Sequence, residues 1–323
     1  IPFVKKSATG GVSKSVLCSG VVVYFLLYHN KAALQRLGPK GDGDWMEQIE
    51  AERILQRKRD KSWFGSSYNV NLYRGCPHGC IYCDSRSACY GVEDFARVRV
   101  KKDALPRLQQ ELAACRESGV VATGSMSDPY NPLERRYGYT RGLLELLDRY
   151  RFGAAIATKG TLVERDIDLL QQISTHSPVI VKVTITTPHD TLSALVEPHA
   201  PPSSRRLAAL EALSHADIFA GVLLMPVLPF LEDGPQDIRL LVQLCARAGV
   251  KFIYPYFGVT LRDRQREYFL QQVRKNWPKV WERYLDYGEN YLCPCRNDGE
   301  LWQIFERECG RYGILCRMEQ IVK

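Results

Sequence analysis

Apolar runs rich in β-branched residues alternate with charged segments of helical periodicity from about residue 66 onward, and this alternation constrains the fold most. The runs predict six strands, over residues 68–73, 120–123, 154–158, 179–186, 219–225 and 252–259. Helices are predicted between and after them, over 102–117, 139–150, 164–174, 203–214, 234–248 and 262–275. Six β/α units in series imply a parallel sheet covered by helices. We therefore predict an α/β fold, a partial (β/α)6 TIM-like barrel with N- and C-terminal extensions.

The six units leave residues at both ends of the 323-residue chain. We predict an N-terminal extension over 1–65, the barrel over 66–276 and a covering element over 277–323. In the extension, Asp44 followed by Glu47 matches a capping box, which predicts a basic helix over 45–59. An apolar run at 16–28 is shorter than the roughly 20 residues that a membrane-spanning helix needs. We predict a buried strand or a packing element there.

The chain carries eleven cysteines and a net charge of +8. An odd number of cysteines in a chain long enough to bury a large core argues against a secreted disulfide scaffold. We therefore predict reduced thiols, a cytoplasmic location and no membrane association. Residues 1–75 hold +6 of the charge, so the barrel is nearly neutral. The basic run at 53–61 is predicted to be a solvated helix face, because no aromatic residues alternate with it as in a nucleic-acid groove.

A loop after the first predicted strand carries three cysteines in close succession, Cys76, Cys80 and Cys83. Thiolates are the usual ligands of iron–sulfur clusters. Three of them can hold three irons of a cubane and leave the fourth iron open to a small molecule. A structural zinc ion with His78 as a further ligand is the alternative, but zinc usually takes paired Cys-x-x-Cys units. Inert thiols are disfavoured by the Pro- and Gly-rich loop, so the spacing favours a cluster.

The motif Cys76-x-x-x-Cys80-x-Tyr82-Cys83 resembles that of the radical S-adenosylmethionine (SAM) superfamily. Neighbouring segments are similar to its spore photoproduct lyase-like branch: Arg74-Gly75-Cys76, Met126-Ser127-Asp128-Pro129-Tyr130, Ala157-Thr158-Lys159, Glu197-Pro198 and Met225-Pro226. The resemblance runs from about residue 66 to 260 with a family-like tail, and it does not cover residues 1–43. The cysteine motif indicates the superfamily, and the other segments indicate the branch.

The resemblance implies a 4Fe–4S cluster on the three cysteines, SAM on its open iron, and an electron donor such as flavodoxin or ferredoxin. One electron would cleave SAM to methionine and a 5′-deoxyadenosyl radical, which would take hydrogen from an unidentified substrate. Matching positions imply contacts with SAM for Ser127, Lys159 and Thr184. Lys159 would pair with the SAM carboxylate, its alternative being a solvated charge.

Two further positions complete the implied cofactor site. Tyr82, beside the cluster, would pack against adenine. For Asp128 the sequence supports two roles equally: binding of the cofactor, or capping of the turn before Pro129. Thr184 also has an alternative, as an ordinary β-forming residue.

One departure from the branch concerns the residue that returns hydrogen to the product. Lyases that repair spore photoproduct carry a cysteine after the second strand, where this chain has Ser125 and Met126. A thioether has no S–H to donate. Cys89 is the candidate substitute as a catalytic residue, with a buried inert thiol as the alternative.

We therefore predict a radical SAM enzyme whose substrate is unidentified, a nucleic acid being one candidate. Two alternatives stay open: a lyase that repairs a thymine photoproduct in DNA after flipping the lesion, and an iron–sulfur electron-transfer or binding protein without turnover. A second metal site on the tail cysteines is disfavoured, because Cys293-Pro294-Cys295 lacks the usual zinc spacing. The tail also contains Cys309 and Cys316.

Overall fold

A seven-stranded sheet forms the centre of the computed structural model, which describes residues 46–323. Its strand order is β10-β9-β8-β7-β6-β3-β2; the six strands from β3 to β10 are parallel, and β2 is antiparallel to β3. The strands are β2 (Leu55–Arg57), β3 (Tyr68–Val70), β6 (Val120–Thr123), β7 (Gly153–Thr158), β8 (Val179–Thr184), β9 (Ala220–Leu224) and β10 (Phe252–Pro255). The predicted partial barrel and its six strands are confirmed.

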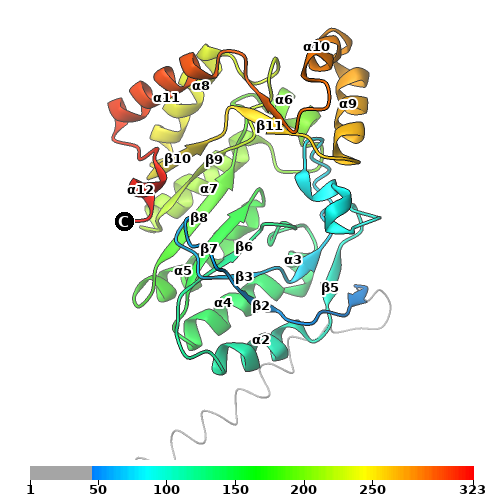
Figure 1. The fold of residues 1–323 in the computed structure, drawn as a ribbon. Coiled ribbons are helices and arrows are strands. Elements are labelled where there is room, and N and C mark those ends of the chain that lie inside the picture. Colours follow the sequence, from blue (N-terminus) through cyan, green and yellow to red (C-terminus); the bar gives the residue numbers. More distant parts are fainter. Residues whose placement is uncertain (1–45) are drawn as a thin grey trace, which may run out of the picture. The chain divides into compact units, whose positions relative to one another are not determined.

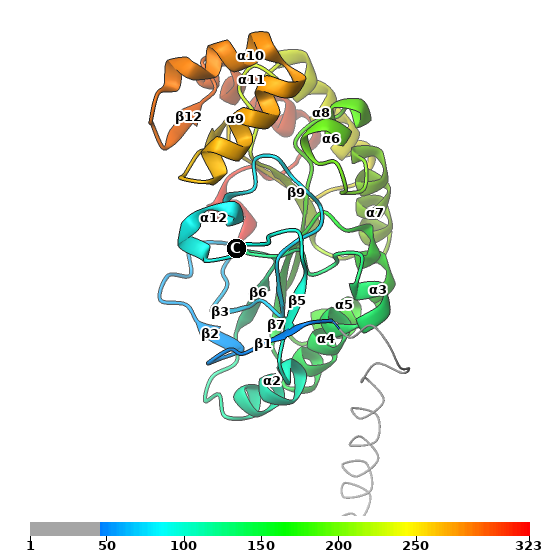
Figure 2. The ribbon, with the colours of Figure 1, turned by 90° about the vertical axis from the view of Figure 1, so that its right-hand side faces the viewer.

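Helices cover the outer face of this sheet, and Figure 2 shows α4, α5, α7 and α8 along its curve. The helices at predicted positions are α2 (Ala104–Ala113), α4 (Tyr139–Arg149), α5 (Ile167–Ser174), α7 (Ser203–His215), α8 (Pro235–Arg247) and α9 (Gln265–Asn276). Side chains alternate between the two faces of a strand. Val181 and Val183 of β8 accordingly share the outer core with Leu210 of α7, whereas Ile180 packs with Phe64 in a second cluster.

The remaining elements are short or lie in the C-terminal part. They are β1 (Gln48–Ile49), β4 (Tyr73–Arg74), η1 (Asp84–Arg86), η2 (Ala88–Tyr90), β5 (Arg99–Lys101), α3 (Glu134–Tyr137), η3 (Thr161–Asp166), α6 (Asp190–Val196), β11 (Gly258–Thr260), α10 (Pro278–Tyr284), η4 (Leu285–Tyr287), β12 (Leu292–Pro294), α11 (Asp298–Tyr312) and α12 (Met318–Ile321). Figure 1 shows α11 alongside α8, and β12 pairs antiparallel with β11. The C-terminal residues thus contact the barrel through α8 and β11.

The predicted basic helix over 45–59 is wrong, because this segment forms two short strands. β1 pairs parallel with β5, and β2 extends the central sheet at its edge. Ile54 and Leu55 are buried in the core, and both of their backbone N–H groups donate to the Glu111 carboxylate. Strand pairing and burial outweigh the local helix signal of the capping box.

Two sequence predictions concern the N-terminus and membranes. The apolar run at 16–28 lies outside the residues that the structure describes. Within residues 46–323, no helix combines the length and the apolar character needed to cross a membrane.

Lys182 is an unusual residue of the barrel interior, because it is buried on β8 between Ala157 and Gly221 of the neighbouring strands. Its Nζ lies 4.6 Å from the centre of the Phe64 ring. Burial, together with the charge of Lys58, lowers the pKa of Lys182 from 10.5 to about 7. The charged form is therefore less stable in the folded chain than in the unfolded one.

We expect Lys182→Met to raise the free energy of unfolding by roughly 4–5 kcal/mol at pH 6–7, since lowering the pKa from 10.5 to about 7 costs about 1.4 kcal/mol for each pKa unit. The penalty that the variant removes is complete below pH 7 and disappears as the pH rises from about 7 to 10.5, where the unfolded lysine also loses its proton. Urea unfolding of both proteins across this pH range measures the gain. An equal gain at pH 6 and pH 10 would contradict the explanation.

Candidate active site

The cysteine loop follows β4 and is fixed by three backbone hydrogen bonds to two other segments. Cys76 N donates to Phe95 O at 2.7 Å, Ile81 N donates to Val196 O at 2.9 Å, and His199 N donates to His78 O at 3.0 Å. Gly75 begins the loop with a φ of +83°, and a Cβ there would stand 2.2 Å from the carbonyl oxygen of Arg97. Only glycine fits this close, left-handed turn.

A cavity of about 330 Å³ opens at the C-terminal ends of β6, β7, β8 and β9. This volume is in the range of small-molecule and cofactor sites. It brings together seven of the nine predicted site residues: Cys76, Cys80, Cys83, Ser127, Asp128, Lys159 and Thr184. Cys80 is buried, and Cys76 and Cys83 are half-buried. Residues from four separate parts of the chain thus face one space.

The other two predicted residues, Tyr82 and Cys89, do not line this cavity. Tyr82 is buried, and its hydroxyl donates to the Glu197 carboxylate. Cys89 is exposed, with its Sγ 3.8 Å from an Arg262 nitrogen, so the alternative of a buried thiol is wrong. The structure therefore places neither side chain against the cavity.

Asp128 joins the loop after β6 to the end of β7. Its carboxylate accepts hydrogen bonds from Thr158 Oγ1 at 2.5 Å, Lys159 N at 2.7 Å and Tyr130 N at 2.9 Å. His78 Nδ1 lies 3.4 Å away. Burial would raise the pKa of Asp128, but His78 and these hydrogen bonds outweigh it and lower the pKa to about 2. The bond from Tyr130 N caps the turn, as one of the two alternatives for Asp128 predicts.

Glu197 is the centre of a buried polar cluster behind the cavity. Its carboxylate pairs with the guanidinium of Arg206, accepts from the Tyr82 hydroxyl, and lies 3.8 Å from Lys159 Nζ. Burial would raise the pKa of Glu197, but Arg206 and Lys159 hold it below its usual value. Arg206 also donates to the carbonyl of Thr184 at 2.8 Å. Sequence reasoning missed Arg206, although the charged start of its helix was visible.

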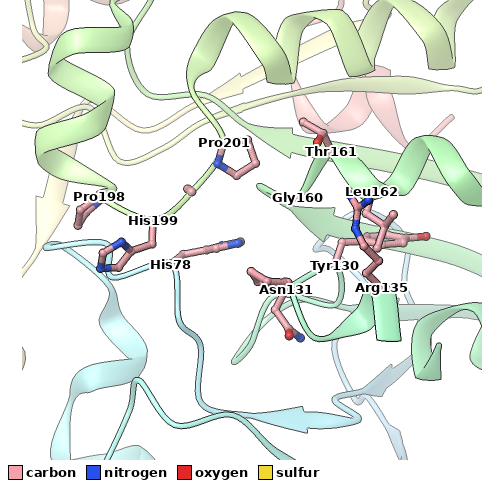
Figure 3. Close-up of a pocket in the computed structure, with 12 residues that line it drawn as sticks. His78, Tyr130, Asn131, Arg135, Gly160, Thr161, Leu162, Pro198, His199 and Pro201 are labelled. Atoms are coloured by element: carbon pink, nitrogen blue, oxygen red, sulfur yellow. The ribbon is translucent and has the colours of Figure 1, made fainter. Parts of the chain in front are cut away.

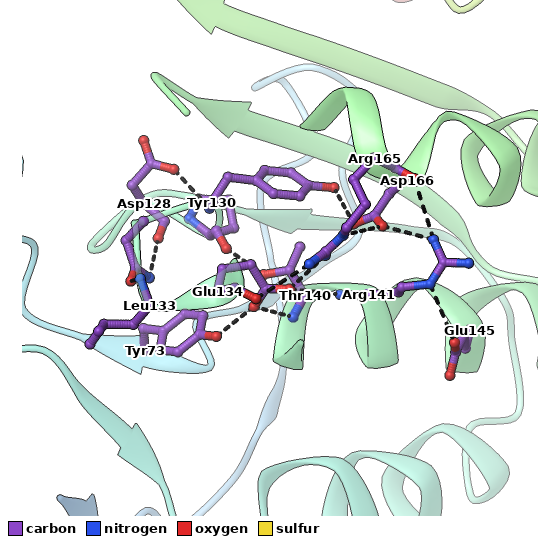
Figure 4. Close-up of polar contacts among 12 residues, drawn as sticks. Tyr73, Asp128, Tyr130, Leu133, Glu134, Thr140, Arg141, Glu145, Arg165 and Asp166 are labelled. Carbon is purple, nitrogen blue, oxygen red and sulfur yellow. Dashed lines mark hydrogen bonds and ion pairs between the residues drawn. The ribbon is translucent and has the colours of Figure 1, made fainter. Parts of the chain in front are cut away.

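A second buried network supports the loop that carries Ser127 and Asp128 (Figure 4). Thr140 Oγ1 donates to Pro129 O at 2.5 Å, and Tyr130 OH donates to Asp166 at 3.1 Å. Arg165 pairs with both Asp166 and Glu134 at 2.7 Å. Each buried acid of this network has a cationic partner. The loop is therefore held rigidly against α4 and η3.

The thiols differ in their electrostatic surroundings. Burial raises the pKa values of Cys80 and Cys83, although the charge of Lys159 opposes it. For Cys76, burial is outweighed by the hydrogen bond to His78, which lowers the pKa. For His78 burial acts in the opposite direction and lowers the pKa, because the charged form of histidine is the cation. Asp128 and Cys76 outweigh burial and raise the pKa of His78 to about 10. Thiolates are the ligand form, so metal binding to Cys80 and Cys83 would release protons.

Within residues 46–323, no three side chains of His, Cys, Asp or Glu gather closely enough to hold a single metal ion. In the tail, Cys293 and Cys295 direct their Sγ atoms to backbone carbonyls of Asn290 and Val227. Cys309 is buried in the core. Thiolates of a cluster, by contrast, bind different irons and stand apart from one another.

Comparisons with known proteins agree with this geometry. Residues 70–245 match the family model of the radical SAM superfamily. The chain is 31% identical over 269 residues to the uncharacterized protein Rv2578c of Mycobacterium tuberculosis, covering 78% of each chain. It is 29% identical over 233 residues to the uncharacterized protein MJ0683 of Methanocaldococcus jannaschii, covering 69% of this chain and 84% of that one.

Solved structures resemble the fold over most of its length. A structure of spore photoproduct lyase with its dinucleoside spore photoproduct matches with a TM-score of 0.61 at 15% identity, covering 90% of this chain and 93% of that one. The methyltransferase TsrM from Kitasatospora setae, with cobalamin and a [4Fe-4S] cluster bound, matches with a TM-score of 0.52 at 12% identity over 76% of this chain and 52% of that one. The cavity at the strand ends is thus carried by a radical SAM fold.

The chain belongs to the radical SAM superfamily. It is an enzyme, and its cofactors are those of the family, a 4Fe–4S cluster and SAM.

Proposed function

We propose that Cys76, Cys80 and Cys83 hold the cluster and that SAM binds beside it in the 330 Å³ cavity. The observation that carries this proposal is that the three thiols line one cavity with Ser127, Lys159 and Thr184. When bound, the cluster and SAM supply reductive cleavage of SAM to a 5′-deoxyadenosyl radical, which takes hydrogen from the substrate. Flavodoxin or ferredoxin is the proposed electron source. The ten described cysteines are all free thiols, which supports a reducing, cytoplasmic location.

The chain's own residues bind and orient SAM in this proposal. Lys159 faces the cavity with only 17% of its side chain exposed, and Glu197 and the Tyr82 ring hold its ammonium in place. It is suited to pair with the SAM carboxylate in a charge-assisted hydrogen bond. The Ser127 hydroxyl donates to Gly75 O at 2.5 Å, so its oxygen stays available to accept from the SAM amine. Apolar Leu223 and Met225 exclude water from the same cavity.

We expect Lys159→Met to weaken SAM binding by roughly 10- to 100-fold, the loss of one charge-assisted hydrogen bond. The iron and sulfide content should stay at the wild-type level, because Lys159 is not a cluster ligand in this proposal. Calorimetric titration of SAM into the anaerobic, cluster-loaded protein measures the dissociation constant. Lys251→Met is the control, because Lys251 directly precedes β10 at the N-terminal end of the strands, opposite the cavity. A dissociation constant within twofold of wild type would contradict the role of Lys159.

The segment after β6 lacks the cysteine that returns hydrogen to the product in spore photoproduct repair. Met126 lines the cavity at that place, and its thioether offers no hydrogen atom. Repair of a thymine photoproduct in DNA is a second candidate, supported by the likeness to a lyase whose structure contains a dinucleoside spore photoproduct. Duplex binding that weakens steeply with salt would support it. The absence of duplex binding at low salt would exclude it.

Electron paramagnetic resonance tests the cofactor arrangement directly. The reconstituted protein is reduced with dithionite, and its spectrum is recorded before and after SAM is added. Coordination of SAM to an open iron should change the spectrum, because the ligand of one iron changes. A spectrum that SAM leaves unaltered at saturating concentration would contradict the proposed site.

A further inference from the structure

A second cavity, of about 440 Å³, lies against the cysteine loop (Figure 3). Its walls come from the loop after β6, the end of β7 and the segment after α6, and they include Asn131, Arg135, Gly160 and His199. His78 lines this cavity and also lines the cofactor cavity. The buried His78 side chain is therefore a shared wall between the two spaces.

The cysteine loop forms one side of this second cavity at close range. His199 N donates to the carbonyl of His78 at 3.0 Å. A Cβ placed on Gly79 would stand 3.0 Å from the His199 ring and 3.2 Å from Pro198. The segment between Cys76 and Cys80 thus packs directly against His199 and Pro198, which line the second cavity.

The second cavity has one cationic lining residue outside the histidines, Arg135. Arg135 is exposed, and none of the residues that line the cavity is acidic. The acids behind it are buried and paired: Glu134 with Arg165, Asp166 with Arg141, and Glu197 with Arg206. The adjacent carboxylate of Glu134 pairs with Arg165, and none of the ion pairs found within residues 46–323 includes Arg135. An acidic partner would therefore meet an uncompensated cation here.

We propose that the second cavity is the docking site of a small acidic one-electron carrier protein, whose carboxylates contact Arg135. The inference rests on the proposed cluster at Cys76, Cys80 and Cys83. SAM would occupy the inner cavity, so a protein donor has to approach the loop from outside. The carrier gives up one electron and is oxidised by one unit, and the cluster takes up that electron; no covalent bond between the proteins forms or breaks.

Arg135→Glu tests the docking site against Arg136→Glu. Arg136 is the next residue of α3 and is also exposed, but it does not line the cavity. The probe is an acidic flavodoxin, titrated in its oxidised form into the cluster-loaded protein in a calorimeter. We expect Arg135→Glu to raise the dissociation constant about tenfold or more and Arg136→Glu to change it less than about threefold, since only one charge meets the partner.

The same variants are then compared in SAM cleavage with two reductants. With reduced flavodoxin, Arg135→Glu should lower the rate about tenfold, whereas with dithionite it should match wild type, because a small reductant needs no docking site. Equal effects of the two substitutions, no effect of either, or flavodoxin that does not bind wild type would overturn the docking proposal. If dithionite drives no cleavage in wild type, the proposed function fails instead.

Discussion

Replacing Cys80 by alanine should abolish both the iron–sulfur absorbance and the reductive cleavage of SAM. Cys80 is buried beside the cavity, and the next residue is fixed by the bond from Ile81 N to Val196 O. The alanine variant would leave only Cys76 and Cys83 for a cluster that needs three thiolates from this loop. Iron and labile sulfide analysis, the visible spectrum and the yield of 5′-deoxyadenosine measure the loss.

Cys316→Ala is the matched control, because Cys316 is a half-buried thiol of the C-terminal part that does not line the cavity. It should keep the full cluster content and the wild-type yield. A Cys80→Ala protein that retains its cluster would contradict the ligand assignment. A wild-type protein that instead binds one zinc ion would contradict the cluster itself.

Glu197→Gln should lower the free energy of unfolding by about 3–5 kcal/mol, the cost of breaking a buried ion pair from one side. Arg206 is fully buried, and the substitution would leave its charge without a carboxylate partner. The same change removes the negative charge near Lys159 and leaves one carbonyl oxygen where two carboxylate oxygens accept from Tyr82 and Arg206. Urea unfolding at neutral pH measures the loss.

Two controls separate the ion pair from a general effect of substitution. The double variant Glu197→Leu/Arg206→Met replaces both charges with apolar groups and should recover a large part of the loss, because the charge of Arg206 no longer stays buried without a partner. Glu306→Gln, on an outer pair with Arg317, should change stability by less than about 0.5 kcal/mol. A Glu197→Gln protein as stable as wild type would show that the pair contributes nothing.

The sequence predicted the barrel because each of its strands carries its own signal. Val179, Val181 and Val183 of β8 lie in the outer core, and the same β-branched run marks the strand in the sequence. The spacing of Cys76, Cys80 and Cys83 likewise predicts them as cluster ligands from one short segment of sequence. Ser127, Lys159 and Thr184 were found by resemblance, and the structure shows why they meet: parallel strands bring their C-terminal ends to one edge.

Contacts between distant segments could not be predicted from local patterns. Residues 45–59 have a helix-start signal, but β2 gains its stability from β3 and from the distant Glu111 carboxylate. In the sequence, Glu197 and Arg206 are charges near helix ends with no special pattern. Only the folded chain shows that they form a buried ion pair and that Glu197 accepts from the Tyr82 hydroxyl. Asp128 carries two plausible roles in the sequence, and only the bonds from Thr158 and Lys159 show how its carboxylate is used.

Quantifying 5′-deoxyadenosine tests the central claim most directly. The protein is loaded with iron and sulfide without oxygen, its cluster content is measured, and SAM and dithionite are added. We predict release of 5′-deoxyadenosine and methionine in equal amounts, in the wild type and in Cys316→Ala but not in Cys80→Ala. A fully loaded cluster that binds SAM and releases no 5′-deoxyadenosine would contradict the account.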